Sequence, residues 1–184
     1  LQEHYNETHT AFMYSATLKA LAIHTADECG PADGPDYMYG WGLLNTARAA
    51  EVISNKGISS NIKEESLSNG STYTLTVDAT GNEPLVATIV WNDPAATPPS
   101  AQLNPTDKML VNDLDMRIDD GTSTYMPWKL DGQNPSSAAT QEDNGVDNVE
   151  KVIVESPSAG TYTITVGHKG TLTDGPQDFS IIVT

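Results

Sequence analysis

Acidic side chains within and beside strand-like segments are the residues best placed to do chemistry. The segment Leu110–Asp120 reads Leu-Val-Asn-Asp-Leu-Asp-Met-Arg-Ile-Asp-Asp. Its apolar residues alternate from Leu114 onward, so Asp113 and Asp115 share one face of a strand. Two carboxylates this close raise each other's pKa unless a cation lies between them. The segment is therefore either a solvated acidic face or half of a calcium site.

Two further acidic clusters could complete such a site. Asp93 follows an apolar segment in the sequence Trp-Asn-Asp-Pro. The third cluster consists of Asp143, Asn144, Asp147, Asn148 and Glu150. Calcium takes about 6 to 8 oxygen ligands, which three clusters can supply, but Arg117 and Ile118 break the spacing of an EF-hand. Calcium binding and a water-facing loop role both stay open from the residues alone.

Other kinds of site find less support in the sequence. The histidines are His4, His9, His24 and His168. None accompanies a Gly-x-Ser-x-Gly motif, and no His-Cys spacing fits zinc. Cys29 is the single cysteine, so neither an intrachain disulfide nor a thiolate metal cage can form. Trp91 and Trp128 could stack on a sugar, but core packing is the simpler expectation for both.

The charge of the chain restricts its partners. The 184 residues include 9 Lys and Arg against 25 Asp and Glu, which gives a formal net charge of −16. This imbalance disfavours nucleic acids and anionic membranes, and it favours divalent cations or a saline, extracellular setting. No apolar segment approaches the roughly 20 residues that cross a bilayer.

Residues 1–56 have helical character. Thr8 or Thr10 could cap a first helix, and Asn45 could cap a short helix over residues 46–53. The small apolar residues of the first helix form one narrow face, which suits packing against a sheet that this segment does not contain. The opening residues resemble the tail of a helix, so we expect the chain to be a fragment of a longer protein.

Residues 57–184 have the pattern of an antiparallel β-sandwich. Short segments rich in Val, Ile, Thr and Tyr are separated by clusters of Gly, Pro, Asn and Asp, as is typical of a sandwich or jelly roll. The predicted strands are residues 58–64, 72–78, 85–91, 111–118, 122–126, 149–154, 162–166 and 179–183. We therefore predict a mainly β fold of about eight strands, with long functional or mobile loops over 92–109 and 127–147.

The helical part resembles the end of a subtilisin-like serine protease catalytic domain. Two segments carry the resemblance: Ala-Thr-Leu-Lys-Ala-Leu-Ala-Ile-His-Thr-Ala-Asp (16–27) and Tyr-Gly-Trp-Gly-Leu-Leu-Asn-Thr-Ala-Arg-Ala (39–49). The resemblance implies that residues 1–56 are the last helices of an α/β domain. The family's Gly-Thr-Ser-Met-Ala-x-Pro motif and its Asp and His motifs are not in the sequence. No catalytic residue can therefore be assigned in this chain.

The β part resembles the P-domain-like jelly roll at the C-terminus of some secreted bacterial subtilases. The matching segments are 87–94, 110–118, 147–152, 159–166 and 175–183. The resemblance implies a secreted endopeptidase that cleaves proteins or peptides through an upstream Asp-His-Ser triad. It also implies a jelly roll that binds structural calcium and braces the upstream catalytic segment. The implied calcium ligands are Asp93, Asp113, Asp115, Asp147 and Glu150. The alternative is a non-catalytic module that binds a protein or a carbohydrate.

Overall fold

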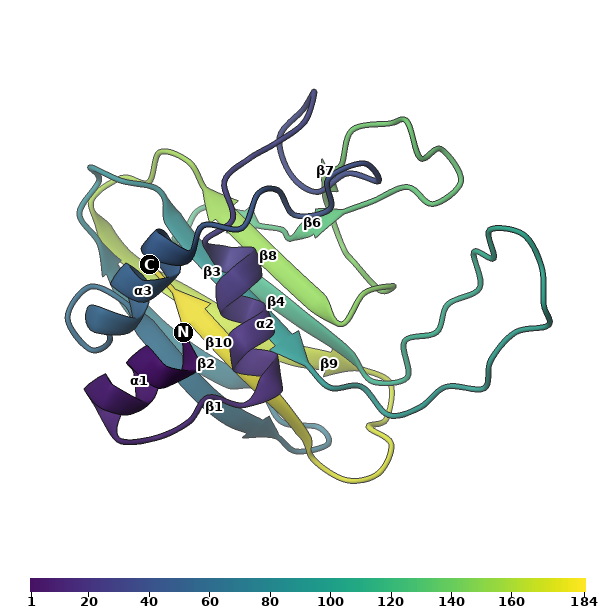
Figure 1. The fold of residues 1–184 in the computed structure, drawn as a ribbon, viewed down its shortest axis with the longest axis horizontal. Coiled ribbons are helices and arrows are strands. Elements are labelled where there is room, and N and C mark those ends of the chain that lie inside the picture. Colours follow the sequence, from purple (N-terminus) through teal and green to yellow (C-terminus); the bar gives the residue numbers. More distant parts are fainter.

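The computed structural model describes residues 1–184 and is mainly β, with three short helices (Figure 1). The helices are α1 (Gln2–His9), α2 (Ser15–His24) and α3 (Thr46–Ser54). The strands are β1 (Asn61–Leu67), β2 (Tyr73–Ala79), β3 (Leu85–Trp91), β4 (Asp113–Asp119), β5 (Thr124–Tyr125), β6 (Trp128–Lys129), β7 (Thr140–Gln141), β8 (Val149–Val154), β9 (Gly160–Lys169) and β10 (Gln177–Val183). The longest helix, α2, has 10 residues, and no helix could span a membrane.

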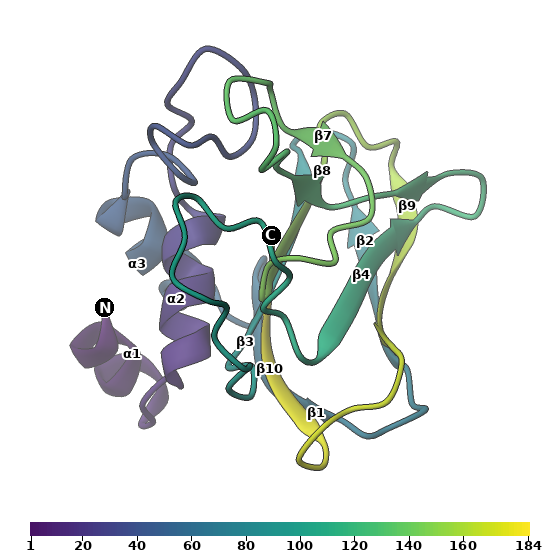
Figure 2. The same ribbon diagram turned by 90° about the vertical axis from the view of Figure 1, so that its right-hand side faces the viewer.

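Two antiparallel four-stranded sheets face each other across a common core (Figure 2). Their strand orders are β1-β10-β3-β8 and β2-β9-β4-β5, and β6 and β7 form a separate pair. Alternating side chains give each sheet one inward face, so both sheets contribute to a core around Trp91, Met116, Ile164 and Phe179. The mainly β, antiparallel architecture predicted from the sequence is confirmed. Each predicted strand overlaps an observed one, and β6 and β7 were not predicted.

The three helices cover the outer face of the β1-β10-β3-β8 sheet, which makes a third layer (Figure 2). α2 lies against β3 and β10, where Ala20, Leu21 and Ile182 are fully buried. Alanine and threonine on this face of α2 allow the helix backbone to approach the sheet closely. In this structure, the sheet that the helical segment needs is therefore supplied by the β part of the same chain.

One of the two predicted helix N-caps is confirmed, and the other is wrong. Asn45 caps α3 as predicted, because its side chain accepts a backbone N–H of the first turn at 2.9 Å. The predicted cap at Thr8 or Thr10 is wrong. Thr8 lies inside α1, where its hydroxyl bonds the His4 carbonyl, and Thr10 ends α1 in a left-handed conformation. α2 instead begins after Tyr14, without a side-chain cap.

Candidate functional site: a charged cluster beside β4

The outer face of β4 carries charged side chains. Its core face consists of Leu114, Met116 and Ile118, all fully buried. Strand alternation places Asp113, Asp115 and Arg117 on the opposite face, which confirms the predicted common face of the two aspartates. The neighbouring strand β9 places Lys169 directly across from Asp113 in the antiparallel ladder. Charges of both signs therefore meet on this face.

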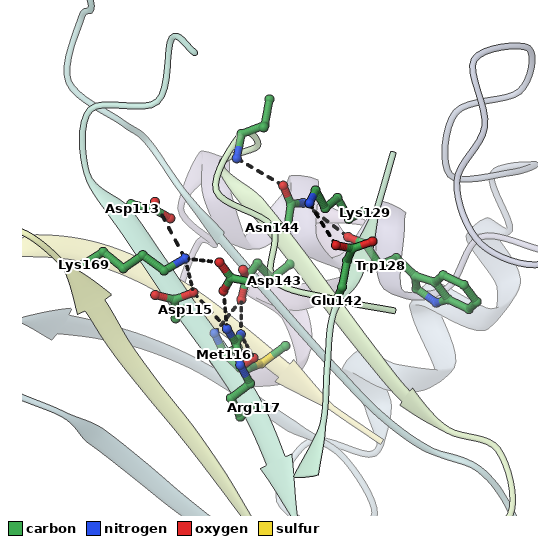
Figure 3. Close-up of polar contacts among 12 residues, drawn as sticks. Asp113, Asp115, Met116, Arg117, Trp128, Lys129, Glu142, Asp143, Asn144 and Lys169 are labelled. Carbon is green, nitrogen blue, oxygen red and sulfur yellow. Dashed lines mark hydrogen bonds and ion pairs between the residues drawn. The ribbon is translucent and has the colours of Figure 1, made fainter. Parts of the chain in front are cut away.

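Lys169 lies among three carboxylates (Figure 3). Its Nζ is 2.5 Å from Asp143, 3.0 Å from Asp115 and 3.9 Å from Asp113. Asp143 belongs to the loop between β7 and β8, which lies beside β4. Partial burial disfavours the ammonium, but the hydrogen bonds that it donates to Asp143 and Asp115 raise the pKa of Lys169 overall. The ammonium group thus takes the position of a cation shared by three acids.

Two more basic side chains complete the charge balance. Arg117 contacts both Asp143 and Asp115, the latter at 3.1 Å, and Lys108 lies 2.7 Å from Asp113. The hydrogen bond from Lys169 lowers the pKa of Asp143 to about 2, whereas burial raises the pKa of Asp115. Because most of these groups touch solvent, each pair contributes about 0 to 1 kcal/mol to stability. The cluster holds the loop beside β4 and has little effect on the core.

Glu150 is the most deeply buried acid in this region. It points inward from β8, is fully buried, and its Oε2 accepts the Met116 backbone N–H at 2.5 Å. That N–H is free because β5 pairs only with Ile118 and Asp119 and leaves the rest of this edge of β4 open. Burial raises the pKa of Glu150 well above its usual range, although the Met116 N–H and the nearby Arg117 oppose this. Glu150 therefore caps an open strand edge between the two sheets.

The other two predicted ligands, Asp93 and Asp147, have local structural partners. Asp93 accepts the backbone N–H groups of Val111 at 2.6 Å and Asn112 at 2.8 Å, which fixes the entry into β4. Asp147 accepts a hydrogen bond from the Asn144 side chain at 3.0 Å. Neither shares a hydrogen bond or an ion pair with the charged cluster. Of the five predicted ligands, the structure brings together Asp113, Asp115 and Glu150.

The cluster supplies oxygen donors, but it also contains its own cations. Two buried carboxylate oxygens, Asp113 Oδ1 and Glu150 Oε1, have no hydrogen-bond partner. Calcium needs about 6 to 8 oxygens, and here Lys169 and Arg117 already contact Asp115 and Asp143 and would repel the ion. No group of three or more His, Cys, Asp or Glu side chains is arranged to hold a metal. This arrangement does not fit calcium, and calcium binding stays a prediction from the sequence.

We expect calcium to leave the melting temperature of the native chain unchanged, because Lys169 and Arg117 already neutralise the acids. A ligand that binds only the folded state must raise its stability, so thermal melts in excess calcium and in excess chelator measure this directly. The variant Lys169→Met should behave differently, because it removes the one cation that all three carboxylates share and leaves only Arg117 and Lys108 beside them. Calcium should then raise its melting temperature.

Magnesium at the same ionic strength is the control for screening of exposed charges. A calcium-specific increase in the native chain would show that the ion pairs give way to the metal and would support the sequence-based prediction.

Trp91 cannot take part in a sugar-stacking platform. Its ring is fully buried in the core between the sheets, and its Nε1 donates to the Asn112 carbonyl at 3.0 Å. Trp128 is half-buried and packs against Gly34, where any side chain would collide with the indole ring. The two rings therefore do not form an exposed surface on which a sugar could stack.

The chain matches no model of a known protein family, and no curated protein matches it in sequence.

Proposed function

We propose that this chain is the C-terminal, non-catalytic part of a secreted subtilisin-like serine endopeptidase. Residues 1–56 would be the last helices of the catalytic domain, and residues 57–184 an accessory jelly roll that braces them. The parent enzyme would hydrolyse peptide bonds with an Asp-His-Ser triad encoded upstream. The resemblance of residues 16–27 and 39–49 to the end of that domain supports this reading.

The observation that carries the proposal is the uneven distribution of exposed apolar side chains. Seven of the eleven exposed large hydrophobic residues lie in residues 1–56, which are less than a third of the chain. These seven are Phe12, Tyr14, Tyr37, Met38, Tyr39, Leu43 and Leu44. A segment that is buried on one side and still apolar on the other fits a second packing partner. We assign that partner to the catalytic segment.

The strand connections support a jelly roll in particular. The chain crosses from one sheet to the other at β1–β2, β2–β3, β3–β4, β8–β9 and β9–β10, and also between β5 and β8. Repeated crossing between two antiparallel four-stranded sheets is typical of that architecture.

Hydrogen bonds between α2 and the sheet that it covers support a bracing role for that sheet. The Thr17 hydroxyl of α2 bonds Ser180 of β10 at 2.8 Å and Glu64 of β1 at 2.5 Å. The buried Lys151 of β8 donates to the Ile23 carbonyl at 3.1 Å. A buried polar group without a hydrogen-bond partner destabilises the folded protein. Moving α2 would break these bonds, so they fix its position on the sheet. Such a contact would hold the end of a protease domain in place.

The proposal predicts that the pure chain does not hydrolyse casein. The coding sequence before Leu1 should specify Gly-Thr-Ser-Met-Ala-x-Pro, and determining that sequence is the direct test. Activity should return when the upstream segment is expressed together with residues 1–184, but not when it is expressed with residues 57–184 alone. The second co-expression is the matched control, because it retains the sandwich and lacks the helices.

Two results would contradict the proposal. Casein hydrolysis by the pure chain would place a catalytic centre within these residues. Retention of the chain on a polysaccharide matrix, together with an upstream sequence that lacks the serine motif, would favour the carbohydrate-binding alternative.

A further inference from the structure

The turn between β1 and β2 contains an exposed Asn-Gly pair. The Ser71 N–H bonds the Ser68 carbonyl at 3.0 Å, so Asn69 and Gly70 are the central residues of a four-residue turn. Gly70 has φ 74°, the left-handed value that a type II turn requires at this position. In an Asn-Gly pair, the glycine nitrogen can attack the asparagine side-chain carbon, because glycine offers no side chain to hinder the ring closure. The turn therefore exposes a reactive dipeptide.

Both reacting groups of this pair have a suitable partner. The Gly70 N–H, which is the nucleophile, donates to His168 Nε2 at 2.7 Å. Because Nε2 accepts this bond, its lone pair faces the proton that must leave, and the ring proton lies on Nδ1. The Asn69 Oδ1 accepts the Leu172 backbone N–H at 3.1 Å. That N–H would stabilise the negative charge that develops on Oδ1 during attack, as an oxyanion hole does.

We propose that Asn69 is a site of self-catalysed deamidation, with His168 as the base and the Leu172 N–H as the oxyanion donor. His168 Nε2 takes the Gly70 proton while the Gly70 nitrogen forms a bond to Asn69 Cγ. The Cγ–Nδ2 bond then breaks, His168 returns the proton to the leaving nitrogen, and ammonia departs from a succinimide ring. Water opens either carbonyl of the ring, which gives aspartate or isoaspartate. The net change replaces an amide by a carboxylate and adds one negative charge.

The chain contains a second Asn-Gly pair that serves as an internal control. Asn144 is fully buried, and its Oδ1 accepts the N–H groups of Val146 at 3.2 Å and Asp147 at 3.3 Å. Its Nδ2 donates to the Trp128 carbonyl at 3.2 Å and to Asp147 at 3.0 Å. The Gly145 N–H has no imidazole beside it. In this second pair the leaving amide is held by two hydrogen bonds, and the Gly145 N–H donates to no side-chain base, so the fold should protect it.

The test measures deamidation at both sites in one sample. The chain produced in bacteria is incubated at neutral pH, native and in denaturant, and its peptides are followed over time by mass spectrometry. Asn69 should deamidate faster in the native chain than in the denatured chain. Asn144 should show the reverse order. A native rate at Asn69 equal to or below the denatured rate would overturn the proposal.

The variant His168→Gln tests the role of the base. Glutamine can still accept the Gly70 N–H but cannot take up its proton, so the native rate at Asn69 should fall by roughly tenfold or more. In denaturant, the variant and the unmutated chain should deamidate Asn69 at the same rate. An unchanged native rate in a folded variant would refute the assignment of His168. If the variant does not fold, the native and denatured rates of the unmutated chain decide the question.

Discussion

Lowering the pH from about 7 to about 4 should reduce the free energy of unfolding by about 3 kcal/mol through His24 alone. The pKa of His24 in the folded chain is about 3, compared with an ordinary value of 6.5. Between these values the unfolded state binds a proton that the folded state does not. The stabilisation is therefore complete above about pH 6.5 and is lost as the pH falls towards 3.

The cause of this shift is the position of His24 between the helices and the sheet. Burial disfavours the imidazolium, and the positive charges of Lys151 and Arg48 add to the effect. The neutral ring is held on both sides. Its Nδ1 bonds Thr88 of β3, and its Nε2 bonds Thr184, which follows β10, each at 2.9 Å. Acid should therefore act first on the contact between α2 and the sheet.

Urea unfolding at several pH values measures this effect, and the variant His24→Gln should flatten the dependence between about pH 6.5 and 4. Glutamine keeps the hydrogen-bonding capacity and cannot acquire a charge. The matched control is His4→Gln, at a histidine outside this contact, which should keep most of the slope. If the free energy of unfolding of the His24→Gln variant fell with pH as steeply as that of the unmutated chain, other groups would cause the acid sensitivity.

The variant Leu21→Ala should lower the free energy of unfolding by about 3 kcal/mol. Leu21 is fully buried between α2 and the sheet, so truncation leaves a cavity in the core that the helices share with β3, β8 and β10. Because this core joins the two parts of the chain, the helix signal in circular dichroism and the tryptophan fluorescence should shift to the same lower urea midpoint.

The control for this variant is Leu18→Ala, one turn earlier in α2 at a position that is only partly buried. Leu18→Ala should lower the free energy of unfolding by much less than Leu21→Ala does, because it removes less buried apolar surface from the core. If Leu21→Ala instead melted the helices early and left the fluorescence midpoint in place, the helices would not belong to the cooperative unit. The bracing contact proposed above would then have no energetic basis.

Local patterns predicted the features that depend on neighbouring residues. The alternation in β4 was enough to place Asp113 and Asp115 on one face, and the Asn45 cap was readable because it acts within one helical turn. The cap expected at Thr8 or Thr10 failed for a local reason as well. Both threonines belong to the end of α1, and an earlier helix competes for them.

Features that depend on distant segments could not be predicted in the same way. Lys169 meets Asp113 only because β9 pairs with β4 in one particular register, and register follows from the packing of the whole sandwich. Asp143 joins them only because the loop between β7 and β8 brings it beside β4. The capping role of Glu150 depends on β5 being too short to cover the edge of β4. The acidic pattern could therefore indicate that a cation lies nearby. It could not show that this cation is a basic side chain of the same chain.

The position of β10 has a consequence for synthesis on the ribosome. β10 follows all the other strands of the sandwich in sequence but lies inside its sheet, hydrogen-bonded to β1 on one side and β3 on the other. The surface on which α2 rests is therefore incomplete until residues 177–183 have left the exit tunnel. Until then, the helices and the early strands emerge with their apolar faces bare, which is when nascent chains aggregate. Translation of residues 1–184 should thus recruit chaperones until β10 has emerged.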